Sequence, residues 1–156
     1  PFHGNEYRQD WKPEAETPTL IALSAQTYTF TGGAHGNMGY DAAIYDRKAD
    51  KRLSFGDLFT NPDAALAALT PAWCKGLDVA RADKRGKEKL AGFTDCPPLG
   101  EQVIVPMGEG RIEQFLILVA PYVAGPWAEG GYEVTVPIAP VQPLLKSSYA
   151  RDFTPS

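Results

Sequence analysis

Hydrophobic and polar residues alternate along several short stretches of the chain, and a period of two predicts β-strands. In the first third this pattern covers residues 26–31 and 40–45, with an apolar run at 20–24 before them. After a polar turn, a short strand is predicted at 52–54, and it completes a predicted hairpin. The N-terminal half therefore predicts a small group of antiparallel strands.

The period of two returns in the last third of the chain. Residues 102–107 and 112–119 flank a glycine-containing turn and predict a second hairpin. Residues 115–119 are apolar on both faces, which is typical of a central strand. Residues 132–138 predict the last strand, and 139–146 a short closing helix.

The middle of the chain carries two helix-start signals. Asn61 and Pro62 match an N-cap followed by proline at the first helical position. Thr70 and Pro71 repeat the same pattern, so a second helix or a kink is expected there. The charged run at 81–89 is expected to be a solvated helix end or loop.

These elements predict an α+β fold: a mainly antiparallel β-sheet with a central pair of helices packed on one face. We expect a single domain over 18–147. Residues 1–17 are interpreted as the remnant of a preceding small domain or as an N-terminal extension, and 148–156 as a C-terminal tail.

Composition narrows the function classes. The chain has 156 residues, a net charge of −4 and a pI near 5.1, so nucleic acid is a poor partner. No apolar run has the length of a membrane span. No motif indicates a cofactor, and we expect none.

Cys74 and Cys96 allow two interpretations. A disulfide would indicate an oxidising compartment, whereas two free thiols would suit a cytosolic protein. Cys96 lies in a proline-containing loop that needs an anchor, which favours the disulfide.

The stretch 31–37 places three glycines around His35, between two predicted strands. A phosphate-binding loop would open a helix, but an alternating strand follows, so a tight strand-to-strand connection is predicted. His35 is a candidate general base or metal ligand, or a structural histidine bonded to backbone. With only His3 as a second histidine, the structural role is favoured and no metal site is predicted.

Three motifs, in this order, resemble a known family: 29–37 with its glycine–glycine–alanine–histidine–glycine core, 53–59 after the first hairpin, and 121–126 running into 132–137. This is the RsiV-like C-terminal domain family, a bacterial envelope domain of unknown function found in RsiV-type anti-sigma factors. The resemblance implies a periplasmic or otherwise extracytoplasmic protein with α+β architecture, often held by an N-terminal membrane or lipid anchor. In the RsiV branch the outer domain receives lysozyme.

We therefore expect a non-enzymatic sensing or binding module, with a lysozyme-like protein or a peptidoglycan fragment as partner. Its expected surface is formed by the two glycine-rich loops. The candidate binding residues are Gly32, Gly33, His35, Asn37, Tyr122, Trp127 and Tyr132.

Two alternatives stay open. One is an envelope hydrolase in which a carboxylate such as Asp41 or Glu129 orients His35 as general base. The other is a purely structural accessory domain. No catalytic residue is assigned, because sequence spacing shows no converging set of groups.

Overall fold

The computed structural model describes residues 4–33, 36–86 and 93–154. Its α+β class and mainly antiparallel sheet confirm the predicted fold class. The strands are β1 (Glu6–Glu16), β2 (Leu20–Phe30), β3 (Asn37–Asp46), β4 (Lys51–Leu53), β5 (Val103–Glu109), β6 (Gln114–Val119) and β7 (Tyr132–Pro137). The helices are α1 (Pro62–Arg85) and the single turn α2 (Ser147–Ala150), with 3-10 turns at Phe55–Leu58, Leu99–Glu101, Trp127–Glu129 and Ala139–Leu144.

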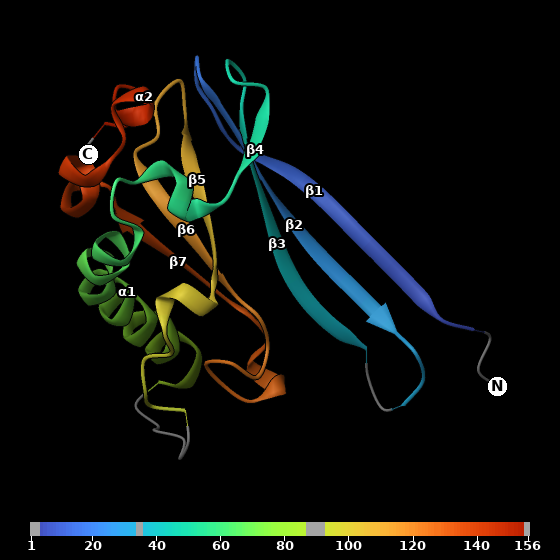
Figure 1. Ribbon diagram of the computed structural model, residues 1–156. Coiled ribbons are helices and arrows are strands. Elements are labelled where there is room, and N and C mark those ends of the chain that lie inside the picture. Colours follow the sequence, from blue (N-terminus) through green and yellow to red (C-terminus); the bar gives the residue numbers. More distant parts are fainter. Residues whose placement is uncertain (1–3, 34–35, 87–92, 155–156) are drawn as a thin grey trace.

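One sheet of order β4-β3-β2-β1-β5-β6-β7 runs through the molecule. Its central junction is short, because β1 and β5 pair only at Ala15–Gly108 and Glu16–Glu109. Beyond that junction β1, β2 and β3 lead away from the rest, and Figure 1 shows them projecting together. We call these three strands the arm, and β5–β7 with α1 the body.

Helix α1 is one continuous element, so the predicted pair of helices is wrong. Asn61 caps its first turn by accepting a hydrogen bond from the Ala64 N–H (3.1 Å). The proline at position 71 lies inside the helix. An unbroken buried stripe with a spacing of four residues runs through both halves: Ala65, Leu69, Trp73, Leu77 and Arg81. Packing along this stripe outweighs the local cost of the proline.

The body sheet is covered on one face by α1 and on part of the other face by the arm. Val134 packs against Gly76 of α1, and its cross-strand partner Ile117 shares that face. Their neighbours Leu118 and Glu133 point to the opposite face, since side chains alternate along a strand. There they line a hollow together with Tyr40 of the arm. The arm therefore covers this face at Leu118, whereas Glu133 on β7 stays exposed.

The C-terminal residues are part of the packed structure and not a free tail. Tyr149, Asp152 and Phe153 are buried. The Asp152 carboxylate accepts hydrogen bonds from the Thr17 hydroxyl (3.0 Å) and the Thr19 N–H (3.1 Å), beside the junction of arm and body. The segment thus fastens the start of the arm.

Strand β1 (Glu6–Glu16) lies before the boundary expected at residue 17, but it is paired with the strand that follows that boundary. It pairs with β2 from Glu6↔Phe30 to Glu16↔Ile21. It therefore shares one sheet with the following strands. The division into 1–17, 18–147 and 148–156 stays a prediction.

A disulfide joins Cys74 of α1 to Cys96, as the favoured interpretation requires. Next to it the Trp73 indole N–H donates to the Pro97 carbonyl (2.8 Å). Both contacts hold the segment after α1 against the helix.

We expect the double variant Cys74→Ser/Cys96→Ser to lose about 3 kcal/mol of unfolding free energy, since the bridge closes a loop with a separation of 22 residues. Denaturant unfolding with and without reductant measures this. Reductant should lower the stability of the wild type but not that of the variant. A variant as stable as the oxidised wild type would contradict the prediction.

Candidate functional site

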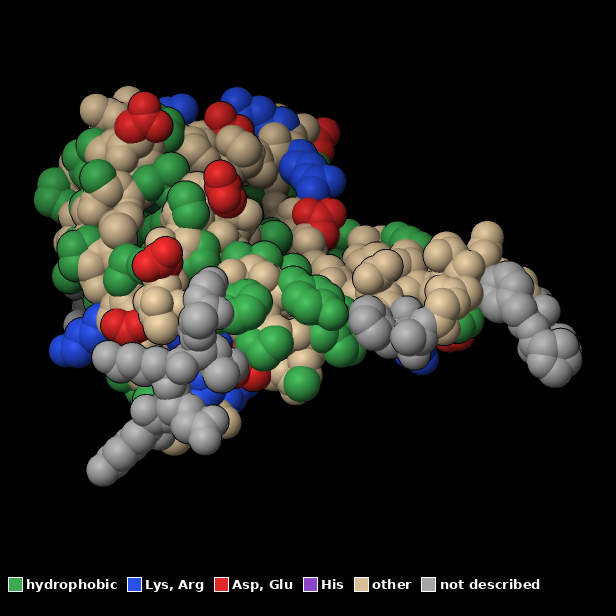
Figure 2. Space-filling model, turned by 90° about the horizontal axis from the view of Figure 1, so that it is seen from below, with side chains coloured by type: hydrophobic (Ala, Val, Ile, Leu, Met, Phe, Trp, Pro, Cys, Tyr) green, Lys and Arg blue, Asp and Glu red, His purple; other side chains and the backbone are tan. Residues whose placement is uncertain are grey.

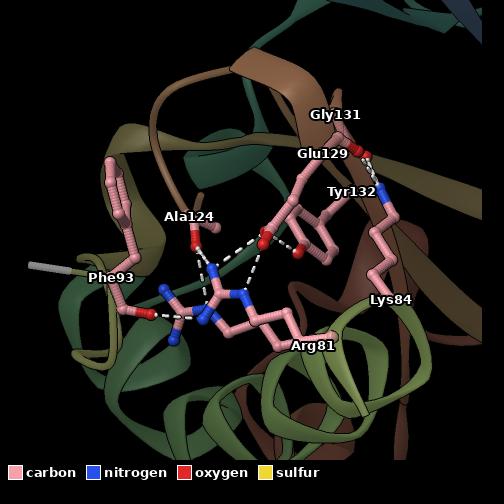
Figure 3. A network of polar contacts seen from close by, with 8 residues as sticks. Arg81, Lys84, Phe93, Ala124, Glu129, Gly131 and Tyr132 are labelled. Carbon is pink, nitrogen blue, oxygen red and sulfur yellow. Dashed lines mark hydrogen bonds and ion pairs between the residues drawn. The ribbon is translucent and has the colours of Figure 1, made fainter. Parts of the chain in front are cut away.

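The last turns of α1 carry three basic side chains that reach one loop. Arg81, Lys84 and Arg85 have spacings of three and four residues, which places them on neighbouring positions of one helix face. Opposite them runs the loop that joins β6 to β7, residues 120–131, which we call the β6–β7 loop. Figure 3 shows Arg81 and Lys84 on the helix side of this loop.

The two arginines bind backbone carbonyls on both sides of them. Arg81 Nε and Arg85 Nη2 each donate to the Ala124 carbonyl at 2.9 Å. Arg81 Nη1 donates to the Asp95 carbonyl (2.7 Å) and Arg85 Nη1 to the Phe93 carbonyl (2.8 Å). The arginines thereby connect the β6–β7 loop to the disulfide-anchored segment.

A buried ion pair completes this network. Arg85 Nε lies 2.5 Å from Glu129 Oε2, and the two side chains are only 6% and 11% exposed. The Tyr132 hydroxyl donates to the other carboxylate oxygen. The Arg85 hydrogen bond lowers the pKa of Glu129. Burial, with the bond to Glu129, raises the pKa of Tyr132 to about 12.

Lys84 closes the network at its edge. Its ammonium donates to the carbonyls of Glu129 (2.7 Å) and Gly131 (2.5 Å) and lies 3.9 Å from the centre of the Tyr132 ring. A cation over an aromatic face is attracted by the ring's quadrupole. The end of the β6–β7 loop is thereby fixed to the helix.

The close approach of this network requires a glycine at position 125. A Cβ there would lie 2.0 Å from Glu129 Oε1 and 2.9 Å from Arg85 Nη2. Both atoms belong to the ion pair, so neither can move away freely. The loop's glycine content follows from packing here.

The β6–β7 loop presents an aromatic pair. The rings of Tyr122 and Trp127 lie 5.6 Å apart between centroids, tilted by 33°. Tyr122 is 56% exposed, and its neighbour Val123 is 40% exposed. Tyr122 has φ +74°, a left-handed conformation that is uncommon for a non-glycine residue. Such backbone strain is retained where the surroundings hold it, and functional sites are where it collects.

Two hollows lie between arm and body, and one of them reaches this loop. The first is lined by Asp10, Trp11, Lys12, Ser24, Ala25, Gln26, Tyr40, Leu118 and Glu133. The second shares Tyr40 and Leu118 with it and reaches Glu101 and Val123. We call the two together the cleft. Figure 2 shows hydrophobic side chains gathered on this underside, between the body and the projecting arm.

The acidic groups of the cleft outnumber the basic ones. Asp10, Glu101 and Glu133 line it, against Lys12 alone. Burial raises the pKa of Tyr40, and the charge of Glu133 acts in the same direction. The cleft is therefore an apolar and aromatic surface with a negative rim.

The first glycine-rich stretch connects β2 to β3 at the outer end of the arm. Gly32 and Gly33 have φ near +101° and +103°, which only glycine adopts readily. The predicted tight connection includes residues 34 and 35, which lie outside the described ranges, so it stays a prediction. Asn37 begins β3 and is exposed. His35 lies outside the described residues, so its role stays a prediction.

The candidate residues thus fall into separate groups. Tyr122 is exposed and Trp127 lies half-buried beside it, whereas Tyr132 is buried beneath the loop at 2% exposure. Gly32, Gly33 and Asn37 belong to the arm, and their part in binding stays a prediction.

Sequence reasoning missed the basic end of α1. Residues 81–89 were expected to be solvated, yet Arg81 is 5% exposed and the Arg85 side chain 6%. The apolar positions 65, 69, 73 and 77 were the available signal, since the same spacing of four residues leads to positions 81 and 85. Among the described residues no group of three or more His, Cys, Asp or Glu side chains is placed to hold a metal ion. No helix in the described ranges is long and apolar enough to span a bilayer.

We expect Glu129→Gln to destabilise the protein at pH 7 by about 1–3 kcal/mol, because the buried Arg85 loses its counter-charge. The folded pKa of Glu129 lies below the ordinary value of 4.5, so its stabilisation is complete above that value and is lost as pH falls through the folded pKa. The difference in unfolding free energy between wild type and variant should therefore become smaller at acidic pH.

Denaturant unfolding from pH 7 to pH 3 measures this difference. Glu133→Gln is the matched control, since Glu133 is exposed on β7. Its unfolding free energy at pH 7 should be close to that of the wild type. A difference that is constant with pH would contradict the ion-pair assignment.

Comparison with known proteins gives a likeness of fold. No protein-family model matches the sequence, and no curated protein matches it. A DUF3298 family protein from Pseudomonas aeruginosa matches with a TM-score of 0.60 and 19% identity, over 90% of this chain and 62% of that one. A member of the same family from Bacteroides fragilis matches with a TM-score of 0.67 and 18% identity, over 95% of this chain and 57% of that one. The chain spans about three fifths of these structures, and at this identity it shares the fold of DUF3298 family proteins.

Proposed function

We propose that the chain is a non-enzymatic binding module of the bacterial cell envelope, of the RsiV-like kind. It recognises a partner through the Tyr122–Trp127 pair and the adjoining cleft. The observation that carries the proposal is an exposed, strained aromatic residue on a loop whose backbone is fixed from below.

Pre-ordering is the first argument. Binding costs conformational entropy, and a loop already held in place loses less of it. The Ala124, Glu129 and Gly131 carbonyls are held by α1, so the aromatic pair is presented on a fixed frame. Rigid aromatic side chains are the residues that most often dominate binding energy at interfaces.

Charge is the second argument, and it favours one class of partner. The acids of the cleft complement a basic protein surface, whereas an uncharged glycan gains nothing from them. We therefore favour a basic protein of the lysozyme kind over a peptidoglycan fragment.

The disulfide is the argument for the cellular compartment. The Cys74–Cys96 disulfide suits an oxidising environment, which supports an extracytoplasmic location. Membrane anchoring belongs to the proposal only through the resemblance to RsiV-like domains.

The hydrolase alternative gains no support from the two carboxylates considered for it. Glu129 is held in the ion pair with Arg85. Asp41 lies exposed on β3, where it accepts a hydrogen bond from the Ala42 N–H (2.8 Å). A general base needs an oriented partner in a site that excludes water.

We expect saturable binding of lysozyme to the purified chain, with Trp127→Ala and Tyr122→Ala each weakening it about tenfold or more, as truncated aromatic anchors do. Raising the salt concentration should also weaken binding, because the complementary charges are screened. Calorimetry against lysozyme and against soluble peptidoglycan fragments measures both partners under the same conditions.

Tyr45→Ala is the matched control, since this tyrosine is 38% exposed on β3 near β4, away from the loop. It should bind as the wild type does. If only peptidoglycan fragments bind, the partner is a glycan and not a basic protein. Binding of neither would leave the accessory-domain role as the better description.

A further inference from the structure

Strand β1 has one open edge. Glu6–Pro13 pair with β2 on one side, and on the other side the described residues offer no partner before Ala15 meets β5. All residues from 6 to 13 are exposed. Figure 1 shows β1 as the outermost strand of the arm. Exposed edges of this length present unpaired backbone groups to other strands.

The charges on one face of β1 alternate in sign. Glu6, Arg8, Asp10 and Lys12 follow each other at every second position, so they share a face of the arm. Edge strands are usually protected by charges that repel a copy of themselves. Here the four charges sum to zero, and the alternation permits attraction.

From this pattern we infer that β1 is a homodimerisation edge, which pairs antiparallel with β1 of a second copy around a two-fold axis at Gln9. In this register Glu6 lies opposite Lys12 of the second copy, and Arg8 lies opposite its Asp10. Two-fold symmetry repeats both pairs, so every charge on this face meets its opposite. Opposite charges on directly facing strand positions stabilise a sheet.

The other face of the strand fits the same register. Tyr7 and Trp11 are 64% and 42% exposed, and their partners Thr29 and Ala25 lie on that face. Centring on Gln9 places Tyr7 opposite Trp11 of the second copy, twice. Aromatic cross-strand pairs are among the favourable ones. The largest exposed side chains of the arm are thereby paired.

Neighbouring registers are unfavourable. Centring on Asp10 would oppose Asp10 to itself and Arg8 to Lys12, and centring on Arg8 would oppose Glu6 to Asp10. Centring on Trp11 would bring Pro13, which has no N–H to donate, into the ladder. Centring on Tyr7 would oppose Glu6 to Arg8 but leave Asp10 and Lys12 without a charge partner. The alternation therefore excludes the even-numbered centres, and Gln9 is the odd-numbered centre that pairs all four charges.

The two junctions with β5 lie at opposite ends of the paired segment, because the strands of the dimer run in opposite directions. The existing contact Arg8–Glu6 (3.7 Å) is between exposed groups, and exchanging it costs little. Lys12 is exposed as well, and its contact with Glu14 (3.6 Å) reaches a carboxylate that is 10% exposed. The product is a continuous sheet through both arms.

Sedimentation velocity over a range of concentrations tests the charge pairing. The wild type should dimerise reversibly, and Arg8→Glu or Asp10→Arg alone should raise the dimer Kd about tenfold or more. The combined variant Arg8→Glu/Asp10→Arg exchanges the charges across the axis and should return the Kd to within a few-fold of wild type. A monomeric wild type at millimolar concentration, or a combined variant weaker than both single ones, would overturn the proposal.

Cysteine cross-linking tests the register independently of these charges. Gln9→Cys should form an intermolecular disulfide under mild oxidation, since residues facing each other on paired strands have Cα atoms about 4.5–5.5 Å apart. Thr27→Cys is the matched control: Thr27 pairs with Gln9 on the same face but lies one strand further in. Two such residues would be about 14 Å apart, or three strand spacings, and should stay unlinked. Equal cross-linking of both variants, or of neither, would refute the register.

Discussion

The two-residue pairing of β1 with β5 is the constraint on which the rest of the molecule depends. Ala15–Gly108 and Glu16–Glu109 make one sheet out of two groups of strands. Because the contact is so short, the strands separate beyond it and leave the arm projecting. The Asp152 carboxylate strengthens the same place through Thr17 and Thr19, residues that lead from β1 into β2. The cleft, the covered face of the body and the open edge of β1 all follow from this junction.

A second interaction determines how the cleft is bordered. The Arg85–Glu129 ion pair is buried, and it is favourable only because hydrogen bonds satisfy its remaining groups. Tyr132 and the Ala124 carbonyl supply those bonds. The β6–β7 loop is consequently as well fixed as a regular element, although its sequence is rich in glycine and proline.

Much of the fold could be predicted from local patterns, because most strands alternate and Asn61–Pro62 marks the start of the helix. Other features depend on contacts between distant residues. Pro71 resembles a helix start, and only the buried stripe around Trp73 shows that one helix continues through it. Strand β1 is exposed from residue 6 to 13 and buries no apolar face there, so its full length becomes visible only through its pairing with β2. The buried arginines of α1 were read as solvated, since no local pattern reveals a carbonyl contributed from more than 35 residues away, as Ala124 is for both.

Helix α1 holds the β6–β7 loop mainly through the backbone of the loop. Arg81, Lys84 and Arg85 bind the carbonyls of Ala124, Glu129 and Gly131, and a carbonyl is present whatever the side chain. The shape of the loop is therefore largely independent of the identity of residues 122, 123 and 127. In evolution those positions could change while the frame is kept, so that one scaffold displays different recognition surfaces. In the laboratory, the same independence makes the loop a place to graft or randomise short sequences.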